Sequence, residues 1–198
     1  MLNKKQANMW VKIVALAVAA AFIAIGALSL VNPGGPALNT ATQASSEDQQ
    51  TQQLITQLQG QLAANPTSTA LLLQLGNTYY DLGRQQVEAK KQVLAQTNFE
   101  LAVDSYKKVL KQRPKDADVR TDMATAMYYA GQTQQAVAQV ARVLKEKPNH
   151  ENALINGGIF YADAGKKDDA RRLWNRYLSL YPQGQGAAQV RQMLSQLK

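Results

Sequence analysis

The sequence contains no cysteine and a single histidine among its 198 residues. The absence of cysteine excludes disulfides, thiolate metal sites and thioether attachment of haem. The one histidine, His150, follows Pro148 and Asn149, where we expect a solvated turn residue rather than a catalytic base or a metal ligand. We therefore predict no metal, no cofactor and no enzymatic activity.

Acidic residues are absent from the first 46 positions, which carry three lysines, Lys4, Lys5 and Lys12. These lysines precede a run without charge or proline, residues 13–31, which as a helix is about 28 Å long and matches the hydrocarbon core of a bilayer. We predict a transmembrane signal anchor at 13–31, with residues 1–12 in the cytoplasm and the rest of the chain outside it. The predicted localisation is a bacterial cytoplasmic membrane that the chain crosses once.

A second interpretation of this segment is a cleaved secretory signal, because Ala27, Leu28 and Ser29 form a small-x-small site. The chain would then be a secreted or periplasmic binder of the chaperone type. Residues 32–46 begin with a Pro- and Gly-rich stretch and are otherwise rich in Ala, Thr, Ser and Gln, so we predict a flexible linker. Residues 47–198 are then predicted to form one elongated domain.

Prolines mark an internal repeat, because Pro114, Pro148 and Pro182 stand 34 residues apart. The same interval relates Ala102, Ala136 and Ala170, then Leu110, Leu144 and Leu178, and also Gly131 and Gly165. The proline closes a helix pair, the glycine marks the turn inside it, and the alanine lets two helices approach closely. One pair cannot bury its apolar face alone, so the repeat predicts a stack of helical hairpins.

The repeated pattern resembles that of the tetratricopeptide repeat (TPR) family, in which large apolar, Leu-Gly/Ala, Tyr, Gly, Ala, aromatic and Pro positions follow one another. The matching residues are Leu72, Leu75, Gly76, Tyr79, Gly83, Ala102, Tyr106 and Pro114 in the first repeat, Met123, Ala124, Met127, Gly131, Ala136 and Pro148 in the second, and Leu154, Gly158, Tyr161, Gly165, Ala170, Trp174 and Pro182 in the third. The resemblance implies an all-α fold, a TPR-type solenoid of helical hairpins with repeats at residues 69–116, 117–150 and 151–184. We expect an N-terminal half repeat before them, started by Ser46, and a capping helix at 186–198 after them.

The first repeat is longer than the others, with 14 extra residues between Arg84 and Asn98. Alignment with Gly131 and Gly165 puts its turn at Gly83. The insertion, residues 84–98, has no Pro or Gly, so we predict that it is helical and protrudes. It either prolongs one helix of the pair or forms an extra segment with a new start capped by Thr97 and Glu100. Its role is either a platform for a partner or an elongation packed on its own neighbour.

The resemblance also implies a concave groove, lined by the first helix of each hairpin, that holds an extended peptide or a partner helix. The implied groove residues are Ala70, Leu73, Asn77, Tyr80 and Asp81; Asp118, Thr121, Thr125, Tyr128 and Tyr129; and Asn152, Ile155, Ile159, Ala162 and Asp163. The aspartates favour a neutral or basic ligand, while the amides, hydroxyls and rings suit a peptide. Leu73, Thr121 and Ile155 stand where relatives that clamp acidic tails carry Lys and Asn, which argues against such a clamp.

The predicted function is a scaffold that binds one or more protein partners. A basic cluster in the third repeat suggests a second contact with anionic lipid headgroups or wall polymers; its residues are Lys166, Lys167, Arg171, Arg172 and Arg176. Nucleic acid is disfavoured because no aromatic platform accompanies these charges. Two narrower roles rest on resemblance alone, the assembly of c-type cytochromes and the assembly of pili or other envelope complexes.

Overall fold

The computed structural model describes residues 38–197, and it describes side chains from residue 49 onward. The predicted span at 13–31 and its flanks, residues 1–12 and 32–37, lie outside the described residues. Within 38–197 no helix is both long enough and apolar enough to cross a membrane. The chain divides into two compact units at residues 43 and 44, and the repeats belong to the second.

Residues 38–197 fold into helices joined by short turns, without a strand in that range, as the all-α prediction requires. The helices are α2 (Leu38–Ala64), α3 (Thr69–Glu88), α4 (Gln92–Gln112), α5 (Ala117–Tyr129), α6 (Thr133–Glu146), α7 (Glu151–Asp163), α8 (Lys167–Leu180) and α9 (Ala187–Gln196).

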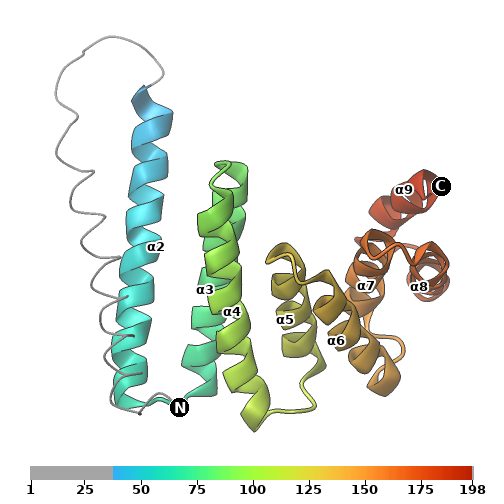
Figure 1. Cartoon of the computed structure of the whole chain (residues 1–198), viewed down its shortest axis with the longest axis horizontal. Coiled ribbons are helices and arrows are strands. Elements are labelled where there is room, and N and C mark those ends of the chain that lie inside the picture. The colour runs from blue at the N-terminus through green and yellow to red at the C-terminus, as the bar shows by residue number, and fades with distance from the viewer. Residues whose placement is uncertain (1–37, 198) are drawn as a thin grey trace, which may run out of the picture. The chain divides into compact units, whose positions relative to one another are not determined.

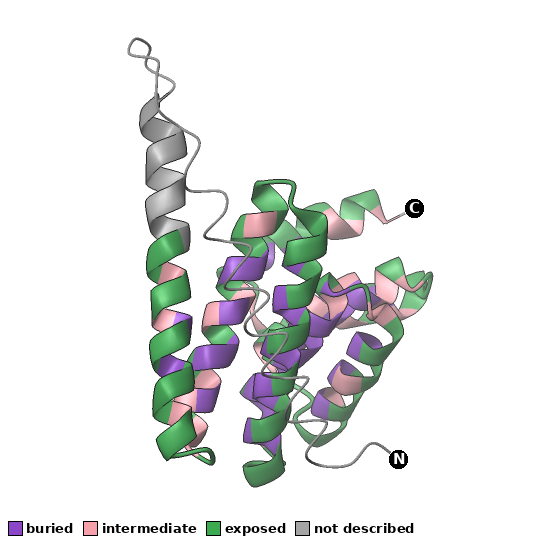
Figure 2. Cartoon of the chain, turned by 60° about the vertical axis from the view of Figure 1, so that its left-hand side comes forward, coloured by how far each residue is buried: buried purple, intermediate pink, exposed green. Residues whose placement is uncertain are grey.

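Helices α3 to α8 form three successive hairpins, α3–α4, α5–α6 and α7–α8, each packed against the next, and α9 packs against α8 (Figure 1). The alanine column lies at their contacts, since Ala102, Ala136 and Ala170 are all fully buried. One continuous core cluster extends from Ile55 in α2 to Phe160 in α7. Figure 2 shows it as a band of buried residues inside the stack. The predicted solenoid of hairpins with a C-terminal capping helix is therefore confirmed.

The 14 extra residues of the first repeat lengthen both of its helices equally, rather than one helix alone. The turn also does not lie at the predicted position. Helix α3 has 20 residues where α5 has 13, and α4 has 21 where α6 has 14. The turn lies at Lys90, with φ 58°, and not at Gly83. Gly83 is buried inside α3, where an added Cβ would lie 2.8 Å from the Phe99 ring.

Of the two alternatives for the insertion, the one with a new helix start at Thr97 is wrong. Thr97 lies inside α4, and its hydroxyl donates to the carbonyl of Val93 at 3.0 Å instead of capping a helix. Between Gln92 and Gln112 the sequence contains no proline or glycine. The insertion therefore continues without a break into the helix that follows it.

Helix α2 begins at Leu38, so residues 38–46 are helical rather than a flexible linker, and Ser46 lies within the helix rather than at its start. No proline or glycine occurs between Pro36 and Gly60, and the segment is rich in the helix formers Ala and Gln, which explains the longer helix. The half-repeat role is confirmed further along, because Ile55 and Leu58 are buried against α3.

Candidate functional site

The first helices of the three hairpins line a hollow of about 330 Å³. Its wall is made by residues of α3, α5 and α7 and one tyrosine of α4: Asn77, Tyr80, Asp81, Asp122, Thr125, Asn156 and Tyr106. On α3, Tyr80 and Asp81 follow Asn77 by three and four residues, and on α5 Thr125 follows Asp122 by three, which keeps the side chains of each helix on one face. Every wall residue carries a polar group, so the hollow is suited to a hydrogen-bonding ligand rather than an apolar one.

Hydrogen bonds within the first hairpin and between the second and third hairpins hold part of this wall in place. The Tyr106 hydroxyl donates to Oδ1 of Asn77 at 2.8 Å, and Nδ2 of Asn156 donates to Oγ1 of Thr125 at 3.2 Å. The first bond engages only the carbonyl oxygen of Asn77, which leaves its amide nitrogen available to a ligand. Burial raises the pKa of the Tyr106 hydroxyl, with the carboxylates of Asp122 and Asp81 adding to the effect, so it remains a donor.

Two carboxylates of the hollow, Asp81 and Asp122, accept no hydrogen bond and form no ion pair among the described side chains. The pKa of Asp122 is raised to about 6, first by desolvation and then by the negative charges of Asp118 and Asp116, while His150 partly offsets the rise. A positive group placed beside Asp122 would remove this penalty. The hollow is thus electrostatically prepared for a cation.

Five aromatic rings continue the wall from the hollow toward the turns. Contacts run from Tyr80 to Phe99 and Tyr129, then through Tyr128 to Phe160, with centroid separations of 4.7 to 6.1 Å. Tyr128 also donates a hydrogen bond to the carboxylate of Asp163 in the next hairpin. Tyr129, 48% exposed, offers a rigid amphipathic surface at the edge of the hollow.

Several predicted groove residues do not line the hollow. Thr121 is 1% exposed, and its hydroxyl donates to the carbonyl of Ala117, so it belongs to the core. Leu73, Ile155 and Ile159 are half-buried and pack against the core clusters. The exposed ones, Ala70, Asp118 and Asn152, lie outside the hollow.

The expectation of a solvated His150 is also wrong. Its side chain is only 9% exposed: Nδ1 accepts a bond from the amide of Ala153, and Nε2 lies 3.0 Å from Asp118. The histidine therefore caps α7 and links it to α5.

Two models of a known protein family match the repeat region of the chain. One model of the tetratricopeptide repeat matches residues 93–153, and a second matches residues 153–184. The chain contains tetratricopeptide repeats. The first match begins at residue 93 in α4, so α3 and residues 84–92 of the insertion lie outside it.

Solved structures with the same fold include forms of MamA. A crystal structure of MamA aligns with a TM-score of 0.60 and 20% identity, over 85% of this chain and 84% of that one. A double mutant of MamA RS-1 gives 0.57 and 12%, over 69% of each chain, and MamA MSR-1 gives 0.54 and 18%, over 68% of this chain and 70% of that one. At these identities the likeness shows a shared fold. No curated protein matches the sequence.

Three residues of the hollow escaped the sequence analysis: Tyr106, Asp122 and Asn156. Asp122 and Asn156 directly follow Thr121 and Ile155, two groove residues that the resemblance implied. Asp122 follows Asp118 by four residues, and this spacing signals one acidic helix face. Tyr106 belongs to a second helix, where its aromatic column was assigned to the core.

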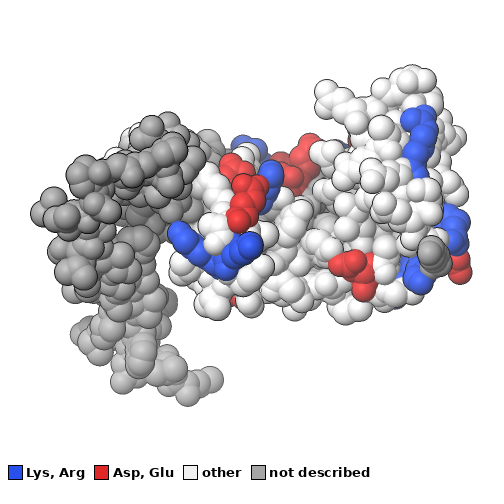
Figure 3. Space-filling model, turned by 90° about the horizontal axis from the view of Figure 1, so that it is seen from above, with Lys and Arg blue, Asp and Glu red and all other residues white. Residues whose placement is uncertain are grey.

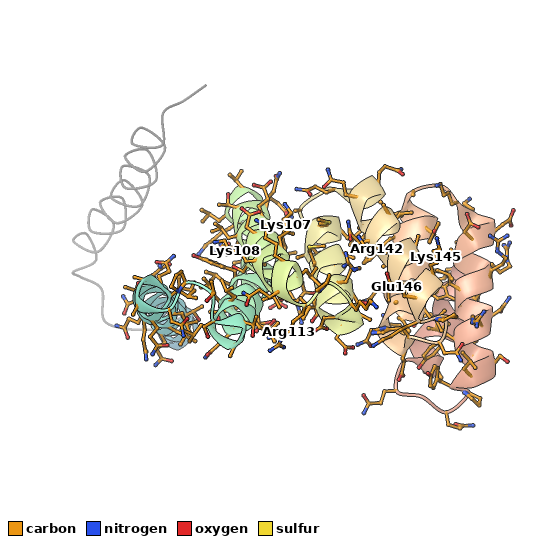
Figure 4. All side chains as sticks on the ribbon, turned by 90° about the horizontal axis from the view of Figure 1, so that it is seen from below. Lys107, Lys108, Arg113, Arg142, Lys145 and Glu146 are labelled. Carbon is orange, nitrogen blue, oxygen red and sulfur yellow. The ribbon has the colours of Figure 1, made fainter. Side chains whose placement is uncertain are left out.

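Charge is segregated between the two layers of the tetratricopeptide repeats. The first helices α3, α5 and α7 carry six acidic and two basic side chains, whereas the second helices α4, α6 and α8 carry nine basic and five acidic ones. Figure 4 labels part of the basic layer, Lys107, Lys108 and Arg113 of the α4 region and Arg142 and Lys145 of α6. The acidic layer is the one that lines the hollow, and the electrostatic field there attracts cations.

Two of the five residues of the basic cluster predicted for an anionic surface pair with carboxylates, and two others contact neutral side chains. Arg171 pairs with Asp168 at 2.8 Å, Arg172 pairs with Asp169, and Arg176 donates to the side chain of Asn149. Lys166 lies 5.8 Å from the centre of the Tyr161 ring. These contacts explain the cluster by local structure.

Proposed function

We propose that the protein is a non-catalytic scaffold that binds a basic segment of a partner protein in the hollow of its first helices. The observation that supports this most directly is the pair of unpaired carboxylates, Asp81 and Asp122, beside amide and hydroxyl groups. A lysine or arginine of the partner would neutralise the carboxylates. Asn77 and Asn156 are placed to bond the backbone on either side of it.

The scaffold is further proposed to be anchored in a bacterial cytoplasmic membrane by residues 13–31, with the repeats outside the cytoplasm. The support is the uncharged 19-residue run and the lysines that precede it. Protease added to intact spheroplasts should degrade the repeats and leave the N-terminal segment with the membrane. Protection of the repeats in intact spheroplasts, with cleavage after lysis, would contradict this topology.

The groove proposal is tested by removing its charge without changing its shape. The double variant Asp81→Asn, Asp122→Asn should lose partners in quantitative pull-downs from crosslinked membranes by roughly tenfold or more, because a charge-assisted bond contributes about 1.5–3 kcal/mol. The control Glu100→Gln, Asp104→Asn removes two acidic groups from α4 in the opposite layer and should keep all partners. Equal recovery with both variants would refute the hollow as the binding site.

A further inference from the structure

The turn of the first hairpin exposes large aliphatic side chains, whereas the exposed large hydrophobic residue beside the other two turns is Tyr129. Three of the large hydrophobic residues that are exposed in the described chain flank this turn: Val87 at 38%, Val93 at 79% and Leu94 at 48%. We call these three residues the apolar tip. Figure 2 shows the end of the α3–α4 hairpin as exposed surface that continues past the buried band. The extension therefore places apolar surface in solvent, at a free-energy cost that a binding partner would recover.

Basic residues accompany the apolar tip. Lys90 and Lys91 form the turn between Val87 and Val93, and Arg84 lies 4.0 Å from its ion-pair partner Glu88 one turn earlier. Figure 3 looks onto this end of the molecule and shows basic groups beside acidic groups and uncharged surface. Apolar side chains next to lysines are the combination that binds the headgroup region of an anionic bilayer.

The path of the chain places this tip at the same end of the repeat unit as residue 44, where that unit begins. Helix α2 runs antiparallel to α3, with Ile55 and Leu58 packed on it and Gln59 bonded to Tyr79 (Figure 1). Residue 44, where the repeat unit begins, lies 20 residues before the end of α2, and the α3–α4 turn follows a helix of 20 residues. Both points are therefore about 30 Å from the α2–α3 turn, at the same end of the unit.

We propose that the apolar tip inserts into the headgroup region of the anionic membrane that holds the chain. The proposal rests on the anchor at residues 13–31, because only 12 residues, 32–43, separate that run from the repeat unit. A short connection keeps the near end of the unit at the bilayer surface. The extension then fixes the orientation of the domain, so that the hollow stands at a defined height above the membrane.

The absence of native cysteine allows a direct test with the full chain. Val93→Cys and, as matched control, Leu180→Cys, the exposed position at the end of α8, each carry one environment-sensitive fluorophore in chains reconstituted into phosphatidylcholine vesicles with 30% phosphatidylglycerol. Doxyl-labelled lipids should quench the label at position 93 by about half and leave the label at 180 unchanged. Introducing either Leu94→Asp or Lys91→Glu into the chain labelled at position 93 should reduce the quenching several-fold. Omitting phosphatidylglycerol from the vesicles should have the same effect.

Retention of the chain in the vesicles after an alkaline wash reports separately on the anchor. Retained chains without lipid quenching at 93 would overturn the tip contact while leaving the anchor intact. A blue-shifted signal at 93 that escapes lipid quenching and vanishes when the chain is diluted with additional lipid would identify a second copy as the occupant, which also overturns it. Chains lost on washing would remove both proposals.

Discussion

The first hairpin is seven residues longer in each helix than the second and third, yet its base packs against its neighbours in the same way. Seven residues are close to two helical turns of 3.6 residues, so the added length returns each helix to nearly the same rotation. Ala95 and Ala102, seven residues apart, are accordingly both buried, as are Phe99 and Tyr106. A hairpin of this kind can therefore be extended at its loop end when both of its helices gain the same number of whole helical turns.

The turns themselves differ in the residue that carries the left-handed backbone. Lys90 has φ 58° in the first hairpin, whereas Gly131 and Gly165 have φ 79° and 77° in the others. Glycine adopts this conformation without steric penalty, and a lysine does not. The first hairpin thus accepts strain at the position where the other two avoid it.

Deleting residues 84–97 should reduce the stability of the chain by several kcal/mol. It joins Gly83 to Asn98, which restores the 34-residue spacing and gives the turn a glycine. We expect the shortened chain to fold with a loss of about 3 kcal/mol, because Ala95 is removed and Phe99 loses its place against Tyr80 and Tyr129. Urea unfolding followed by circular dichroism measures the change.

An unequal deletion sharpens the same comparison. Removing residues 92–98 alone shortens α4 by two turns and leaves the end of α3 without a partner. This variant should be less stable than the 14-residue deletion although it loses half as many residues. The opposite order would mean that the two helices are not coupled through matched length.

The base of each repeat was predictable from the sequence, and its tip was not. Columns such as Ala102, Ala136 and Ala170 recur because every hairpin must bury the same contact, so spacing alone locates them. The turn at Lys90 was missed because glycine, present at Gly83, is a stronger turn signal than lysine. Gly83 is a glycine for another reason, since its lack of a side chain lets the Phe99 ring approach α3 closely. Asp122 was missed since its significance depends on side chains from three helices that only the stack brings together.

Exchanging the turn residues tests the strain directly. Lys90→Gly should stabilise the chain by about 0.5–1 kcal/mol, and Gly131→Lys should destabilise it by about 1.5 kcal/mol, since nothing but the backbone conformation opposes a side chain there. Lys91→Gly is the control: its φ is −93°, so glycine relieves no strain and should not stabilise. A stabilising Lys91→Gly would indicate that charge, not conformation, is responsible.

Asp122 differs from its counterparts Gln74 and Asn156 in carrying a charge. Because its folded pKa is raised to about 6 from the ordinary 3.8, the charge destabilises the fold as the pH rises through this interval. Asp122→Asn should therefore gain about 1 kcal/mol at pH 7.5, discounted for solvent exposure, and nothing below pH 3.8. Stability curves of both proteins from pH 3.5 to 8 measure the difference. A gain that persists at the lowest pH would point to packing rather than charge.

Removing the N-cap side chains of the first helices should have the smallest effect on the free energy of unfolding. The effect should be equal in the long and the short hairpins. Ser68 accepts from the amide of Leu71 at 3.4 Å and Asp116 from that of Val119 at 3.2 Å, whereas Gln132 at the start of α6 makes no side-chain cap bond. Ser68→Ala and Asp116→Ala should each cost about 0.5 kcal/mol, at the low end of the usual range because the bonds are long, and Gln132→Ala nothing. Thermal unfolding resolves these steps. A Ser68→Ala loss several times larger than that of Asp116→Ala would show that the added turns of the first hairpin alter the energetics of its base as well as of its tip.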